Sequence, residues 1–185
     1  ALSYASVKKH SSKAPGGNIF NLENVFFPIN FQDQKHWTLG YVDMKKKMIY
    51  YYDSMNPTDK KNGQEYQNMI HQYLIHEHIN LTKKNLSPDW CFVDVGHTRG
   101  PLQMDCQNCG PHIILIVDAI CTLGVPPEVL FLFEDWNTTS EDLDKYRYRL
   151  GHLILKAELP AIQDLPTKID KELTPSPYHK PSQTD

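Results

Sequence analysis

The sequence predicts an α+β domain, and three observations support this fold class. Segments rich in strand-forming residues gather in the first third of the chain. Segments with the apolar spacing of helices dominate the remainder. One further strand candidate, residues 90–95, falls between two of these helices. Strands and helices are therefore mixed rather than strictly alternating, which is the pattern of an α+β fold.

The predicted strands are short and lie close together in the chain. Residues 24–30 contain valine, isoleucine and two phenylalanines, which favour strands. Residues 36–44 form a second candidate and residues 48–53 a third. Three lysines at positions 45–47 separate these two, as expected for the charged tip of a hairpin.

Three helices are predicted. Residues 63–81 carry apolar side chains at helical spacing. Residues 109–123 are largely apolar, so we expect this helix to be buried nearly all round. Asn108 is a good N-cap for it, and Pro111 suits its first turn. Residues 140–159 are amphipathic, with acidic residues in the first turn, where the helix dipole favours them.

Length and composition indicate one domain with two tails. The chain of 185 residues is 40% hydrophobic, which is enough for a core. Residues 1–18 are polar and contain lysines, which predicts a flexible, solvated arm. Residues 160–185 are rich in proline, serine and threonine and predict a flexible tail. The compact unit is expected at residues 19–159.

Charge and hydropathy exclude several classes of partner. The formal net charge of -3 is too small to require a nucleic-acid or membrane partner. The most apolar stretch, residues 113–117, is far shorter than the roughly 20 residues of a membrane span. We therefore expect neither a nucleic-acid nor a membrane partner. A monomer is also expected.

The cysteines favour a reducing compartment. Four cysteines without regular spacing do not form a disulfide framework, so a nuclear or cytoplasmic location is expected. Cys91 and Cys121 are interpreted as small core residues. Glu77, on the predicted helix at 63–81, is assigned to a solvated face.

Three residues in particular indicate catalysis. His36 opens one predicted strand, and Asp53 ends the next. If the two strands pair as an antiparallel hairpin, these side chains meet at one end of the ribbon. The carboxylate then holds one imidazole nitrogen and leaves the other facing a nucleophile.

Cys109 is the candidate nucleophile. It stands at the start of the apolar helix, where the helix dipole favours the reactive thiolate. Gln103 lies six residues upstream and is a candidate to direct its side-chain amide at an oxyanion. Backbone N–H groups of Cys109 and Gly110 are candidates to assist it. This set is suited to covalent acyl transfer.

The ordered set His36-Trp37, Asp53, and Gln103 followed by Cys109-Gly110 resembles the SUMO (sentrin)-specific, ubiquitin-like-protein protease family. The order His, Asp, Cys matches that family and differs from papain, in which the cysteine comes first. Residues 25–30 and 142–149 also resemble family segments, so the match spans roughly residues 20–158.

The resemblance implies a fold, a reaction and a substrate. The fold is a cysteine-protease fold, with a central helix bearing Cys109 packed on a mixed sheet bearing His36 and Asp53. The reaction is cleavage after the C-terminal Gly-Gly of a SUMO-like modifier, in conjugates or in precursors, without a cofactor or metal. Trp37 is implied to wall a narrow tunnel that only glycine can thread.

The chain departs from the family at two places. The residue before the cysteine is usually aspartate, whereas here it is Asn108. An early family helix contains a tryptophan that forms the other tunnel wall, and none of the 35 residues before His36 matches it. Either the chain lacks that first helix or the tunnel is built differently.

Other interpretations remain open. Cys106 and Cys109 form a C-x-x-C, which also occurs in redox dithiols and zinc sites. A loop-like segment before it and the lack of a second paired motif argue against both. A reversible disulfide between Cys106 and Cys109 under oxidation is a further hypothesis. The rival functions are an acyltransferase of related fold and a catalytically silent module that binds a modifier.

Overall fold

The structure is a computed structural model that describes residues 8, 10–55, 59–93, 102–103, 105–122, 124 and 140–156. The chain divides into two compact units, Ala1–Lys145 and Tyr146–Asp185. The helix α5, Ser140–Lys156, crosses the boundary between them. The predicted tail at 160–185 lies outside the described residues.

The first unit contains a four-stranded mixed sheet. Its strands are β1 (Asn24–Phe31), β2 (His36–Asp43), β3 (Met48–Tyr52) and β4 (Cys91–Phe92), in the order β1-β2-β3-β4. β2 pairs antiparallel with β1 and with β3, whereas β3 and β4 are parallel. The α+β fold class predicted from the sequence is confirmed.

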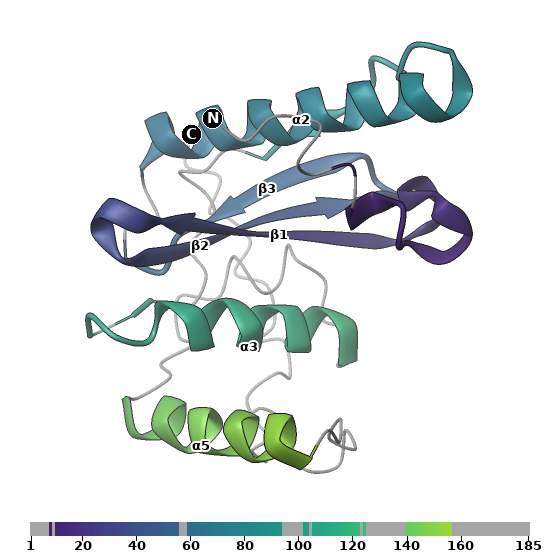
Figure 1. Cartoon of the computed structure of the whole chain (residues 1–185). Coiled ribbons are helices and arrows are strands. Elements are labelled where there is room, and N and C mark those ends of the chain that lie inside the picture. Colours follow the sequence, from purple (N-terminus) through teal and green to yellow (C-terminus); the bar gives the residue numbers. More distant parts are fainter. Residues whose placement is uncertain are drawn as a thin grey trace, which may run out of the picture. The chain divides into compact units, whose positions relative to one another are not determined.

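Two helices cover opposite faces of this sheet (Figure 1). α2 is Lys60–Thr82 and α3 is Cys109–Thr122. Tyr50 and Tyr52 of β3 pack in one cluster with Ile116 of α3. Ile49, on the alternate side, packs with Leu74 of α2. Because successive strand residues point to opposite faces, one run of apolar residues serves two cores.

The segment before the sheet contacts α2. Ser11 is buried, and its hydroxyl donates a hydrogen bond of 2.8 Å to Glu77 Oε1. Two short 3-10 turns follow, Pro15–Gly17 and Ile19–Asn21, and Ile19 enters the core on the α2 side. Of the predicted arm at residues 1–18, residues 1–7 and 9 lie outside the described residues.

Three burial predictions were wrong. Glu77, assigned to a solvated face, is 2% exposed, because α2 buries that side and Ser11 supplies a hydroxyl to its carboxylate. Cys91 and Cys121, assigned to the core, are exposed. Cys91 lies in the two-residue edge strand β4, and Cys121 is near the end of α3, where burial is less complete. None of the described helices combines the length and apolar content needed to cross a bilayer.

Gly40 lies where β2 and α2 pack closely. A β-carbon at this position would overlap Cδ1 of Ile70 and lie 3.4 Å from Cβ of Phe27. We therefore expect Gly40→Val to overpack this layer and lower the free energy of unfolding by about 1–3 kcal/mol. Chemical denaturation followed by circular dichroism measures this change. An unchanged midpoint would contradict the close packing of α2 on β2.

Candidate active site

His36 and Asp53 meet at one end of the β2–β3 hairpin. β2 begins at His36, and Asp53 directly follows β3, whose Tyr52 is paired with Leu39. His36 Nε2 lies 2.7 Å from Asp53 Oδ1, and both residues are buried. The structure thus contains the contact that an antiparallel hairpin predicts.

This contact fixes the roles of the two ring nitrogens. Asp53 Oδ1 also accepts a hydrogen bond of 2.9 Å from the backbone N–H of Met55, which holds the carboxylate in place. A carboxylate only accepts, so Nε2 of His36 carries the proton in this contact. In the neutral ring Nδ1 is then the basic atom. Nδ1 is buried and has no hydrogen-bond partner among the described residues, which leaves it free to take a proton.

Cys109 is the first residue of α3 and is buried. The backbone N–H of His112 donates to the carbonyl of Asn108 at 2.9 Å, so the helix begins where the sequence predicts. The expected cap by the Asn108 side chain is absent. Its amide nitrogen donates to Asp105 Oδ2 at 2.7 Å, and its oxygen is unpaired within the described residues. The nearby Asp105 carboxylate competes successfully for this side chain.

Trp37 and Gly110, which follow His36 and Cys109, bring β2 and α3 into contact. A β-carbon on Gly110 would lie 4.0 Å from Cδ1 of Trp37, which is van der Waals distance. The indole therefore faces the first turn of α3 and remains 38% exposed. No hydrogen bond joins His36 Nδ1 to the Cys109 thiol in this structure. Such bonds are often long in free enzymes and tighten when substrate binds.

Gln103 lies beside the same strand end. Its backbone N–H donates to the carbonyl of Ser54 at 2.9 Å, and its side-chain oxygen accepts from Ser54 Oγ at 3.0 Å. Its side-chain nitrogen donates to the carbonyl of Asp105 and lies 3.3 Å from Asp105 Oδ1. The side-chain amide of Gln103 is therefore fixed between the segment after Asp53 and the turn before Cys109.

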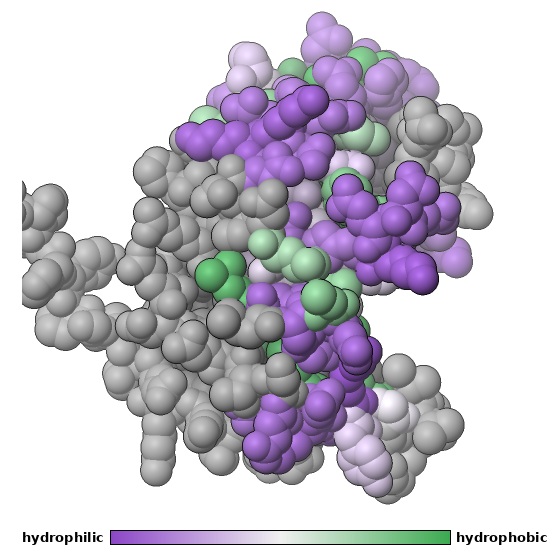
Figure 2. Space-filling view, turned by 90° about the vertical axis from the view of Figure 1, so that its left-hand side faces the viewer, coloured by the Kyte–Doolittle hydropathy of each residue, from purple (hydrophilic) through white to green (hydrophobic). Residues whose placement is uncertain are grey.

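Exposed apolar side chains flank these polar groups. Trp37, Met55 and Leu102 are 38%, 50% and 47% exposed. They belong to the segments that carry His36, Asp53 and Gln103, respectively. Figure 2 shows the molecule from the left of Figure 1, and hydrophobic surface lies there between hydrophilic regions. Sequence reasoning identified Trp37 only; the exposure of Met55 and Leu102 depends on tertiary packing and leaves no local signal.

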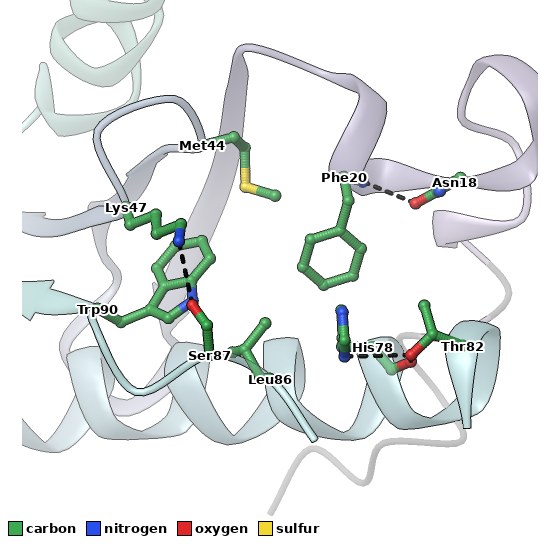
Figure 3. A pocket seen from close by; sticks show the side chains of 9 residues that line it. All are labelled: Asn18, Phe20, Met44, Lys47, His78, Thr82, Leu86, Ser87 and Trp90. Atoms are coloured by element: carbon green, nitrogen blue, oxygen red, sulfur yellow. Dashed lines mark hydrogen bonds between the residues drawn. The ribbon is translucent and has the colours of Figure 1, made fainter. Parts of the chain in front are cut away.

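A pocket at the opposite end of the hairpin is separate from these residues. Met44 and Lys47, in the β2–β3 turn, line it together with Phe20, His78, Trp90 and four neighbours (Figure 3). The rings of Phe20 and His78 meet edge to face at 5.2 Å. Met44 lies eight positions after His36 along the strand, which corresponds to roughly 25 Å. This pocket therefore does not adjoin the candidate catalytic groups.

His112 is a second buried histidine in the first turns of α3. Its side chain is fully buried, and neither ring nitrogen has a hydrogen-bond partner among the described residues. Burial lowers the pKa of His112 from 6.5 to about 4, and the negative charge of Asp105 opposes part of this shift. His112 is therefore neutral at pH 7. The described residues contain no group of three or more His, Cys, Asp or Glu side chains placed to hold a metal ion.

A family model matches residues 4–157, which is most of the chain. Its description is the Ulp1 protease family, C-terminal catalytic domain. The chain belongs to the Ulp1 protease family. The matched range includes the candidate site residues from His36 to Gly110.

Among the relatives in this family is Ubiquitin-like-specific protease 1 of Saccharomyces cerevisiae. It is 30% identical over 97 residues, which cover 52% of this chain and 14% of that protein. The chain therefore corresponds to a small part of this relative's length.

Solved structures of Ulp1 proteases share the fold. The Ulp1 protease domain in complex with Smt3, the yeast ortholog of SUMO, superposes with a TM-score of 0.58 at 25% identity. That similarity covers 83% of this chain and 61% of the other. Three structures of the SUMO protease Ulp1, with TM-scores of 0.60 at 25% identity, hold its catalytic cysteine as a sulfenic, sulfinic or sulfonic acid. Each similarity covers 83% of this chain and 62% of the chain in the solved structure.

The buried side chain of His112, in the first turns of α3, predicts a pH effect on the stability of this Ulp1-family protein. As the pH falls below 6.5, the unfolded chain protonates His112, but the folded chain does so only near pH 4. Stability is therefore lost between these values, by up to about 3 kcal/mol. We expect His112→Leu to remove this component. Urea denaturation of both proteins between pH 7 and pH 4 measures it, and parallel profiles would contradict the prediction.

Proposed function

We propose that this chain is a thiol protease that cleaves after the C-terminal Gly-Gly of a SUMO-like modifier, in conjugates, in precursors or in both. The observation that carries the proposal is the 2.7 Å contact between His36 and Asp53, with a buried and unpaired Nδ1 on the other side of the ring. Membership of the Ulp1 family supports the reaction class. The known complex of the Ulp1 protease domain with Smt3 supports the substrate class.

In the proposed mechanism, His36 is the general base and Cys109 the nucleophile. Nδ1 takes the thiol proton, and the sulfur attacks the carbonyl carbon of the last glycine. Asp53 stabilises the imidazolium that forms, because its carboxylate accepts the hydrogen bond from Nε2. His36 then gives the proton to the leaving amine, and water hydrolyses the remaining thioester.

The oxyanion of the tetrahedral intermediate needs donors close to Cys109. Gln103 is our candidate, with help from backbone N–H groups at the start of α3. The side-chain nitrogen of Gln103 contacts the backbone carbonyl oxygen and Oδ1 of Asp105. One of its N–H groups must therefore leave the 3.3 Å contact with Oδ1 to reach substrate. The exchange costs little, because 3.3 Å is long for a hydrogen bond of this type.

Trp37 is proposed to select glycine. It is partly exposed beside Gly110, which follows the nucleophile, so an acyl chain entering toward Cys109 passes the indole. A flat ring at this position accepts a backbone without β-carbons and rejects bulkier residues. The apolar face of the ring also provides contact for the extended tail.

The proposal includes the setting of the protein. The partners are the SUMO-like modifier and its conjugates, and the chain acts as a monomer, without nucleic acid or membrane. We place it in the nucleus, the cytoplasm or both. All four cysteines are free thiols, and this is the state that those reducing compartments maintain.

A modifier with an electrophile at its C-terminus tests the reaction directly. We expect SUMO carrying a C-terminal vinyl sulfone to form a covalent adduct with the chain at Cys109, because the thiolate attacks where the glycine carbonyl would lie. Gel mobility and peptide mass mapping detect the adduct. Cys109→Ser is expected to form none, and ubiquitin with the same electrophile serves as the specificity control.

The same experiment separates the rival functions. Tight binding of SUMO without an adduct would favour a silent binding module and would contradict the proposed protease. Labelling of Cys109 by acetyl-CoA, with none by the modifier, would favour an acyltransferase. Running several modifiers in parallel identifies the preferred one.

The carboxylate of Asp53 provides a further prediction, and the same strand pair offers a matched control. Asp53→Ala is expected to lower kcat by about 10²–10⁴-fold, because His36 loses its orienting charge. We expect little change in KM for a fluorogenic SUMO substrate, since Asp53 is buried behind the histidine.

Asp43→Ala is the control for this prediction. Like Asp53, Asp43 is buried and accepts a backbone N–H, that of Lys46 at 2.8 Å, but it lies at the other end of β2. The Asp43→Ala variant loses a comparable hydrogen bond but leaves the candidate catalytic residues intact, so its kcat should stay within about twofold of the wild type. Equal losses of kcat in both variants would show that Asp53 acts only through stability.

A further inference from the structure

Cys106 is an exposed cysteine three residues before the candidate nucleophile. Cys109 itself is buried but retains 6% exposure, and both residues are free thiols. The proposed hydrolysis does not use Cys106. Its position next to a reactive thiol nevertheless gives it a chemical role that the distant cysteines, Cys91 and Cys121, do not share.

The bend between the two cysteines is held by hydrogen bonds to Asp105. Its Oδ1 accepts from the backbone N–H groups of Gln107 and Asn108, at 2.8 and 2.9 Å. An aspartate that accepts from N–H groups two and three residues further on forms a compact local turn, and this one ends where α3 begins at Cys109. Its Oδ2 accepts from the Asn108 side chain at 2.7 Å, which fixes the carboxylate further.

This bend keeps Cys106 and Cys109, three residues apart, within a short span of chain. In compact turns, α-carbons three residues apart lie within about 7 Å. Disulfides join α-carbons about 4.4–6.8 Å apart, so such a turn is compatible with one. The exposed Cys106 lies before α3, where a shift of its side chain does not disturb the packed face of the helix.

We propose that Cys106 and Cys109 form a reversible intrachain disulfide when the site meets a peroxide. The inference rests on the reactive Cys109 of the proposed function, but not on which modifier the chain cleaves. The solved structures of the Ulp1 SUMO protease that hold oxidised catalytic cysteines show that a nucleophile of this family reacts with oxidants. In this chain, Cys106 intercepts the first product.

The chemistry is balanced with peroxide as the oxidant. The Cys109 thiolate attacks one oxygen of hydrogen peroxide, breaks the O–O bond and becomes a sulfenic acid, and the released hydroxide takes up a proton to give water. The Cys106 sulfur then attacks the Cys109 sulfur and expels hydroxide, which takes the Cys106 proton to form a second water. Two thiols and one peroxide thus yield one disulfide and two waters. Without Cys106, further peroxide converts the sulfenic acid to sulfinic acid, which thiols do not reduce.

Controlled oxidation of the full chain tests this inference. Wild type, Cys106→Ser and Cys91→Ser are treated with hydrogen peroxide and then divided, with and without dithiothreitol. Cys91 is the matched control, because it is equally an exposed free thiol but lies in β4. Mass mapping of the peptide that spans residues 106–109 and thiol labelling of Cys109 are the two readouts.

Wild type and Cys91→Ser are expected to lose two hydrogens from this peptide and to regain the thiol with dithiothreitol. Cys106→Ser is expected to gain oxygen instead, and to recover at least about tenfold less Cys109 thiol. Equal recovery in Cys106→Ser, a disulfide to any other cysteine, or an unreactive Cys109 would each overturn the inference.

Neither readout requires cleavage of a modifier. A chain that forms this disulfide but is not captured by the SUMO electrophile would refute the proposed function alone. A chain that is captured but shows no disulfide would refute only this inference.

Discussion

The antiparallel register of β2 and β3 is the constraint on which the candidate site depends. It pairs Leu39 with Tyr52 and so places the start of one strand beside the end of the other. His36 and Asp53 are separated by seventeen residues of chain but share a hydrogen bond. A slip of one residue would turn Tyr50 and Tyr52 away from α3, so the core that stabilises the sheet also preserves this contact.

The same sheet also explains how a thiol reaches this end of the hairpin. α3 packs its apolar face on β2, and its first turn therefore lies near the residues that open that strand. The clearest contact of this kind is between Trp37 and Gly110, where the indole packs against glycine backbone that has no β-carbon. Gln103 and Asp105 connect the two sides through hydrogen bonds to Ser54 and to the turn before the helix. Four separate chain segments thus contribute to one small region.

Much of this arrangement could be predicted from the sequence, because periodicity and order along the chain are local signals. The strands at 24–30, 36–44 and 48–53 end within a residue of β1, β2 and β3. The burial of Glu77 and the exposure of Cys91 could not be predicted, since each depends on which distant segment packs beside it. The Asn108 side chain is a similar case. Its residue type favours capping, but the competing Asp105 carboxylate becomes close only in the folded turn.

The hydrogen bond from Ser11 to Glu77 sets a practical limit for anyone who shortens this chain from its start. The hydroxyl reaches a carboxylate that is almost fully enclosed by α2 and its surroundings. A recombinant fragment starting at the first strand would remove this hydrogen bond from a buried carboxyl group. Fragments intended for crystals or assays should therefore start upstream of the lysines that precede Ser11, even though the candidate chemistry begins only at His36.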